Sequence, residues 1–252
     1  MQNAQNRVYY YIEDIRVKRY KRKGKGGSAA DTCMITYEEI RNNQEIATYI
    51  READDSLRAL GFTEHADAHV GAVAKRCEYL LSTLGFDAHT VELSRIAAHL
   101  HDIGNVINRT DHSQSGALMA FRILDRLGMP PADIATVITA IGNHDEGTST
   151  PVNAVAAALI LADKSDVRRS RVRNADPASF DIHDRVNYSV TDSRLTVDAE
   201  ARVCTLSLTI DTAISAIMDY FEIFLGRMLL CRRASERLGL SFSLFINGQR
   251  FA

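Results

Sequence analysis

The sequence predicts a mostly α-helical protein that ends in a small α+β unit, an antiparallel sheet with one long helix. Across residues 34–176, apolar residues recur three and four positions apart, which is typical of helices that bury one face. After Pro177, short β-branched or alternating runs separated by polar turns predict strands instead. The chain has 252 residues, 46% of them hydrophobic, which is enough for one core and a smaller appended unit.

Residues 1–33 are expected to form a mobile basic tail. They contain eight Lys/Arg and three Asp/Glu, whereas the whole chain has a net charge of −2. A basic tail could contact nucleic acid, but the overall charge predicts no general attraction to nucleic acid or to an anionic membrane. The alternative is that this stretch is an upstream extension of the reading frame and that Met34 is the natural start.

The first two helices are predicted at residues 37–60 and 64–84. In the second helix the apolar residues alternate at spacings of three and four. His69 lies three residues after Ala66 and four before Val73, so its side chain is expected to face the core.

The next helix is predicted at residues 90–100 and runs into the pair His101-Asp102 before an Ile-Gly step ends it. Neighbouring helical residues point roughly 100° apart, but a long imidazole and a short carboxylate can still reach one ion between them. Further helices are predicted at residues 112–127 and 131–141.

A helix is also predicted after Thr150-Pro151, a favourable N-cap and first position. Its apolar stripe continues through Leu159 and Ile160, and Asp163 follows them at spacings of four and three. An unpaired carboxylate buried on such a face would cost several kcal/mol or be forced to protonate. A metal or a basic partner is therefore expected beside Asp163.

In the C-terminal unit, strands are predicted at residues 184–190, 194–198, 202–210 and 241–246. A long helix predicted at residues 212–238 is too apolar for a helix with one wet side, so we expect the sheet or a second subunit to cover it. The unit is therefore expected to build a homodimer interface rather than part of the catalytic pocket. An apolar ligand pocket between sheet and helix is the alternative.

Histidine and aspartate residues occupy several of these apolar faces, and they supply the nitrogen and oxygen ligands that borderline and hard divalent metals prefer. A single inward His is more often a hydrogen-bonded core residue, and we assign His89, His99 and His183 to that class. His65, four residues before His69, could share its face but is not included among the ligands. The combination indicates a buried metal centre, with these candidate ligands: His69, His101, Asp102, His112, His144 and Asp163.

Five stretches carry these ligands: HVGAVAKRCEYLLSTLG, IAAHLHDIGN, DHSQSGALMA, VITAIGNHDEG and AAALILADKSDVRRSR. A first His, a His-Asp pair that closes an apolar helix, and a later Asp followed by Lys form a fairly specific series. The series resembles the HD superfamily of metal-dependent phosphohydrolases over roughly residues 60 to 173. The resemblance implies an HD-type helical catalytic domain at residues 34–176, followed by the α+β unit at residues 177–252.

The resemblance also implies the ligand set. In the family, the first His, the His-Asp pair and the last Asp hold one metal, which here means His69, His101, Asp102 and Asp163. One branch of the family has extra histidines that hold a second metal, and the Asp of the pair bridges the two metals. In this chain, His112 and His144 occupy the positions of those histidines. One or two divalent ions per chain are expected, with Fe, Mn, Zn, Mg and Ni not distinguished.

The chain departs from the family pattern twice. Some members of the two-metal branch have consecutive histidines where this chain has His144-Asp145. Many members have Lys where this chain has Asn105, so another cation such as Lys164 or Arg109 must contact the phosphate. The basic residues after Asp163 could also neutralise a polyanionic substrate, or they could be a solvated helix end: Arg168, Arg169, Arg171 and Arg173.

Phosphoester hydrolysis is the reaction that such ligands favour, because a metal-bound water loses its proton near neutral pH and two metals can clamp the reacting oxygens. Asp102 and Asp145 are the catalytic candidates, and Asp145 could act as a proton donor or lie on the loop surface. We expect a hydrolase that acts on a nucleotide or other small phosphorylated metabolite. The alternative is an HD-like regulatory or dimerising scaffold, which the loss of a ligand would favour, and no ligand is missing.

Composition excludes several other classes. The four cysteines are scattered without close pairs, so neither a zinc knuckle nor a disulfide framework is indicated, and a reducing cytoplasm is the expected location. The longest apolar segment, residues 152–162, is too short to span a bilayer. The expected partners are a small phosphorylated substrate and a second copy of the chain, and neither a membrane nor nucleic acid is expected.

Overall fold

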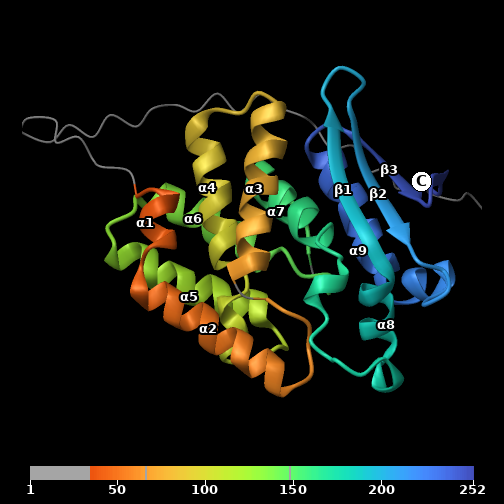
Figure 1. Cartoon of the computed structure of the whole chain (residues 1–252). Helices are drawn as coiled ribbons and strands as arrows, with labels where there is room; N and C mark the ends of the chain where they lie inside the picture. Colours follow the sequence, from red (N-terminus) through yellow and green to blue (C-terminus); the bar gives the residue numbers. More distant parts are fainter. Residues whose placement is uncertain (1–34, 66, 148) are drawn as a thin grey trace, which may run out of the picture. The chain divides into compact units, whose positions relative to one another are not determined.

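The computed structural model describes residues 35–65, 67–147 and 149–252, and these residues form nine α-helices and one small sheet (Figure 1). The mostly α fold with a C-terminal α+β unit is therefore confirmed. The expectations for the basic tail and for Met34 lie outside the described residues. Within these residues no helix is long and apolar enough to cross a membrane.

Two helices, α1 (Tyr37–Arg41) and α2 (Gln44–Ala59), replace the single helix predicted at residues 37–60. Asn43 separates them, because its backbone is extended and its side chain accepts hydrogen bonds from the amides of Glu45 and Ile46. A capped N-terminus of this kind requires the preceding helix to end.

Five helices form the core that carries the candidate ligands: α3 (Asp67–Thr83), α4 (Ala88–Leu100), α5 (His112–Arg126), α6 (Pro131–Gly142) and α7 (Ala154–Lys164). All five agree with predicted helices. The N-cap of α7 is Asn153 rather than Thr150, since the Asn153 side chain accepts a hydrogen bond from the Ala156 amide. Residues 155–162 of α7 are all buried, and α7 packs against α3, α4, α6 and α9 (Figure 1). The end of α7, with Asp163, therefore lies inside the protein.

A close contact at Gly104 sets the position of α5 relative to the end of α4. Gly104 lies in a short 3-10 helix, Ile103–Val106, and a Cβ added there would lie 2.0 Å from the His112 carbonyl oxygen and 2.5 Å from the Gly116 amide nitrogen. Only glycine permits this approach. The contact brings the start of α5 against the His101-Asp102 pair.

Residues 184–190 form most of a helix, α8 (Ile182–Ser189), where a strand was predicted. The prediction was wrong because Asp181 caps this segment, accepting a hydrogen bond from the Asp184 amide, and because Val186 and Ser189 bury one helical face. Local capping and the spacing of three outweigh the β propensity of the run.

The sheet has the strand order β1 (Val190–Asp198), β2 (Val203–Ile210), β3 (Ser241–Ile246), β4 (Gln249–Arg250). The pairs β1–β2 and β3–β4 are antiparallel as expected, whereas β2 and β3 are parallel. Helix α9 (Ile217–Arg237) connects β2 to β3 and supplies the crossover that a parallel pair needs.

Helix α9 joins the C-terminal unit to the helical core. It packs against α7 and against β3 (Figure 1), and residues from both sides of Pro177 belong to one buried apolar cluster. Much of its apolar excess is therefore covered within the chain, including Tyr220, Phe224 and Met228.

Candidate metal centre

The six predicted ligands meet at one place in the interior. They come from the first turn of α3, the end of α4, the start of α5, the loop after α6 and the end of α7, in this order: His69, His101, Asp102, His112, His144 and Asp163. The four histidines are at most 1% exposed, and the Asp163 side chain is 12% exposed.

Four of these residues, His69, His101, Asp102 and Asp163, surround the first of two candidate metal positions. The His69 Nε2 atom lies 3.3 Å from Asp163 Oδ1, and His101 Nε2 lies 3.2 Å from Asp102 Oδ2. The crossed distances, His69 Nε2 to Asp102 Oδ2 and His101 Nε2 to Asp163 Oδ1, are both 3.8 Å. Two ring nitrogens and two carboxylate oxygens therefore face a common space.

The ring nitrogens of His69 and His101 show that this space fits a cation. Their Nδ1 atoms donate to Asp166 Oδ2 at 2.8 Å and to the Ala98 carbonyl at 2.7 Å. Both Nε2 atoms are buried and have no hydrogen-bond partner among the described residues. Because orphaned buried nitrogens are costly, their lone pairs suit a metal ion.

A second group lies on the other side of Asp102. Asp102 Oδ1 is 3.4 Å from His112 Nε2 and 3.9 Å from His144 Nε2, and these two nitrogens are 3.2 Å apart. Their Nδ1 atoms donate to the carbonyls of Arg109 and Ile141. In neutral rings two Nε2 lone pairs then face one another, an arrangement that a second cation would relieve.

Burial and neighbouring charges together set the charge of these groups. It lowers the pKa of both His112 and His144 below the ordinary value, so both rings are neutral at pH 7, the form that binds metals. Burial would raise the pKa of Asp102, but the neighbouring His101 outweighs it and holds that pKa well below the usual range. Lys164 does the same for the pKa of Asp163. Both carboxylates are therefore charged.

Comparison with known proteins agrees with this geometry. The HD domain family model matches residues 66–176, the stretch that contains all six ligands. The match to the HD domain family thus covers residues 66–176 of this chain.

Proteins similar to this chain include one relative and one solved structure. An uncharacterized protein of Methanocaldococcus jannaschii is 24% identical over 172 residues, which is 59% of this chain and 66% of the relative, just under two thirds of its length. The crystal structure of a predicted HD superfamily hydrolase from an uncultured Thermotogales bacterium shares 28% identity, covers 50% of this chain and 68% of that one, and has a TM-score of 0.39.

A cavity of about 300 Å³ opens beside the candidate ligands and is bordered by Asp102, His112, His144 and Asp163. The C-terminal unit lines it through α8 and α9, so the expectation that this unit stays outside the pocket was wrong. The reason is that α9 packs on α7, which brings the side chains of Phe224 and Arg227 over the end of α7. His65 and His183, which were not predicted as site residues, also line the cavity.

Four cations line this cavity: Arg109, Lys164, Arg171 and Arg227. Arg109 and Lys164 were predicted phosphate contacts. Arg171 was named only among the basic residues after Asp163, and Arg227 was missed, because nothing in the local sequence of α9 indicates which helix its side chain will face.

Arg168 and Arg169, the other predicted phosphate contacts, do not line the cavity. Arg168 Nε donates to Asp166 Oδ1 at 3.1 Å. Arg169 Nε donates to the Tyr188 carbonyl at 2.7 Å, and its guanidinium lies over the Tyr188 ring. Both side chains contact other parts of the protein instead.

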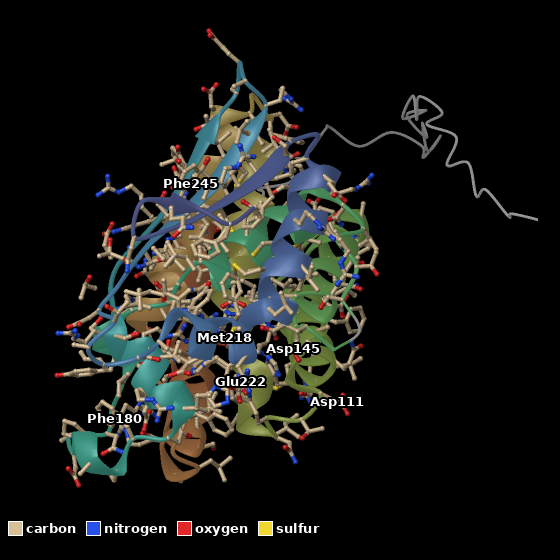
Figure 2. The ribbon with its side chains drawn as sticks, turned by 90° about the vertical axis from the view of Figure 1, so that its right-hand side faces the viewer. Asp111, Asp145, Phe180, Met218, Glu222 and Phe245 are labelled. Atoms are coloured by element: carbon tan, nitrogen blue, oxygen red, sulfur yellow. The ribbon has the colours of Figure 1, made fainter. Side chains whose placement is uncertain are left out.

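Lys164 lies at the centre of an acidic group beside the candidate ligands. Its Nζ is 2.9 Å from Asp163 Oδ2, 3.4 Å from Glu146 Oε2 and 3.9 Å from Asp145 Oδ1. Asp145, in the loop after α6 (Figure 2), is half-buried and does not line the cavity. Burial, together with Glu146, raises the pKa of Asp145.

Proposed function

We propose that this HD protein is a metal-dependent phosphohydrolase that cleaves a phosphoester of a nucleotide or other small phosphorylated metabolite. The observation that supports this most is the meeting of His69, His101, Asp102 and Asp163 at one point beside a cavity whose lining includes three arginines and a lysine. A cavity of about 300 Å³ suits a small molecule. Phosphate-bearing substrates suit its arginines, because guanidinium groups match phosphate oxygens in pairs.

In this proposal, His69, His101, Asp102 and Asp163 would hold one divalent ion. Asp102, His112 and His144 would hold a second. The metals, when bound, supply a water that loses its proton near neutral pH and positive charge for the phosphoryl oxygens.

The chain itself binds and orients the substrate. Asn105 occupies the place where many HD members have Lys, and its Nδ2 donates to Asp102 Oδ1 at 3.0 Å. Its Oδ1 accepts a hydrogen bond of 3.2 Å from Arg109 Nη1. Asn105 thus holds Arg109 at the cavity beside Asp102, and we assign Arg109 the phosphate contact that the absent Lys would make.

Asp145 was predicted as a catalytic residue, and because it does not line the cavity we propose a positioning role for it. Its carboxylate contacts Lys164, which lines the cavity. We assign Asp145 the task of helping Glu146 and Asp163 hold the Lys164 ammonium in place.

The test is a panel of nucleotides, sugar phosphates and diesters incubated with metal-replete protein, with release of the product alcohol or phosphate as the readout. We expect turnover of at least one small phosphoester that chelation abolishes. His101→Ala should abolish this turnover, whereas His89→Ala on the same helix α4 should retain it. No turnover on any substrate, with metal bound, would favour the scaffold alternative.

We also propose that the protein is a homodimer that pairs through the outer face of α9. This outer face comprises Met218, Glu222, Leu225, Leu229 and Arg232, which follow one another at spacings of four and three. Met218 is 74%, Leu225 50% and Leu229 42% exposed. Met218 and Glu222 lie on the side of α9 that faces the viewer in Figure 2.

The outer face is complementary to itself when two copies of α9 pair antiparallel. A two-fold axis midway between Leu225 and Leu229 brings these leucines opposite one another. The same axis brings Glu222 opposite Arg232 of the partner subunit, so opposite charges meet on both sides of the apolar centre. This arrangement supports a second copy of the chain as the occupant of the face.

A further inference from the structure

Asp166, three residues after Asp163, lies behind the metal centre and was not among the predicted site residues. It is 1% exposed, and its Oδ2 accepts the hydrogen bond of 2.8 Å from His69 Nδ1. This bond places the ring proton of neutral His69 on Nδ1, so that the Nε2 lone pair faces Asp102 and Asp163.

Three arginines surround the Asp166 carboxylate. Arg76 Nη1 and Arg168 Nε lie 2.9 Å and 3.1 Å from Oδ1, and Arg171 Nη1 lies 3.8 Å from Oδ2. A buried carboxylate needs such charge-assisted partners to stay ionised and fixed. Asp166 is therefore held from several directions while it contacts His69.

Arg171 extends this network to the cavity. Its Nη1 donates to the Asp166 carbonyl at 2.8 Å, and its Nε donates to the Glu64 carbonyl at 2.9 Å. These bonds fix the side chain of Arg171, a residue that is 5% exposed and lines the cavity. Asp166 thus contacts both a candidate metal ligand, His69, and a cation that lines the cavity, Arg171.

We propose that Asp166 is a positioning residue that couples the metal site to the phosphate site. Through its carboxylate it fixes the orientation and tautomer of His69, and through its carboxylate and carbonyl it holds Arg171 at the cavity wall. The inference rests on the proposed metal centre. Carboxylates behind metal-bound histidines raise the basicity of the ring, and their loss commonly weakens metal binding about 10- to 100-fold.

The test is calorimetric titration of Mn²⁺ into the full chain after chelator treatment, with circular dichroism as a check on folding. Asp166→Asn should bind Mn²⁺ about 10- to 100-fold more weakly than the wild type. Asp166→Glu keeps the charge and should recover part of the affinity, which a purely structural role would not produce. Arg169→Gln is the matched control, because Arg169 lies in the same segment after α7 but contacts Tyr188 rather than Asp166 or His69, and it should bind Mn²⁺ as the wild type does.

The coupling is tested with inorganic phosphate as the probe on the Mn²⁺-loaded proteins. Arg171→Gln should weaken phosphate binding without changing the affinity for Mn²⁺, whereas Asp166→Asn should weaken both. Wild-type affinity for Mn²⁺ in folded Asp166→Asn would overturn the inference and leave the proposed function intact. A wild type that binds no Mn²⁺ would instead overturn both.

Discussion

In each of the four candidate histidine ligands, the two ring nitrogens have different kinds of partner. The Nδ1 atoms of His69, His101, His112 and His144 all bond to a protein oxygen, and the Nε2 atoms all face a carboxylate oxygen of Asp102. The repeated arrangement fixes each tautomer before any ion binds. Asp102 divides the histidines into two pairs, because His69 and His101 face Oδ2 whereas His112 and His144 face Oδ1.

This division predicts a change in metal stoichiometry for His144→Ala. Metal-replete wild type should contain close to two ions per chain by elemental analysis, and the variant should fall towards one, because the site at Asp102 Oδ2 keeps all its ligands. His183→Ala, a change at the cavity wall outside both groups, should leave two. A wild type that stays at one ion under metal-replete conditions would reduce the centre to a single site.

Single residues were predictable where helical periodicity alone decides the direction of a side chain. His69 and Asp163 are of this kind, since their spacing from apolar neighbours requires an inward orientation. Asp166 and Arg227 acquire their roles only from the packing of distant helices, so no local pattern marks them. The grouping of the basic residues after Asp163 was visible, but which of them faces the cavity depends on the turn that follows α7.

Among the helices and strands, N-caps determine the element boundaries where hydrophobic periodicity alone is ambiguous. The periodicity of residues 37–60 continues across the break at Asn43, so periodicity alone predicts one helix where capping produces two. The same competition explains α8, where Asp181 starts a helix in a run that favours strands by composition. The direction of β3 relative to β2 could not be read from the strands, because it depends on the path of α9.

The cap of α4 gives a prediction for stability, since α4 carries His101 and Asp102 into place. The Asp87 side chain accepts hydrogen bonds of 2.9 Å from the amide and the hydroxyl of Thr90. Asp87→Ala should lower the free energy of unfolding by about 1 kcal/mol, measured by urea denaturation at pH 7. Asp87→Asn, which keeps an acceptor oxygen, should lose less, and equal losses in both variants would contradict the capping role.

The same cap has a pH dependence of known sign. The hydrogen bonds from Thr90 lower the pKa of Asp87 in the folded state. Its ionised form therefore stabilises the protein fully above the unfolded pKa of about 3.9, and this contribution is lost as the pH falls through the lower folded value. The stability difference between wild type and Asp87→Asn should shrink between pH 5 and about pH 3.

For the whole molecule, the C-terminal unit completes the pocket of the HD domain. The inner face of α9 packs on α7 and brings Arg227 to the cavity, while its outer face remains exposed. The sequence predicted the apolar excess of this helix, but it could not assign its inner face to α7, because that contact joins segments far apart in the chain.

The outer face predicts the oligomeric state. Light scattering at low micromolar concentration should give a dimer for the wild type and a monomer for Leu225→Asp. Glu222→Arg should weaken the dimer by placing like charges opposite one another, and the double variant Glu222→Arg, Arg232→Glu should restore it. A monomeric wild type, or a dimer unchanged by Leu225→Asp, would rule this interface out.

Metal analysis of Asp102→Ala is the decisive test of the proposed metal centre, because Asp102 contacts both groups of histidines. Wild type purified without chelator should contain a divalent metal and hydrolyse a phosphoester. Asp102→Ala should lose both the metal and the turnover while circular dichroism shows nearly unchanged helical content. Full metal occupancy in this variant would contradict the assignment of His69, His101, Asp102 and Asp163 as one metal centre.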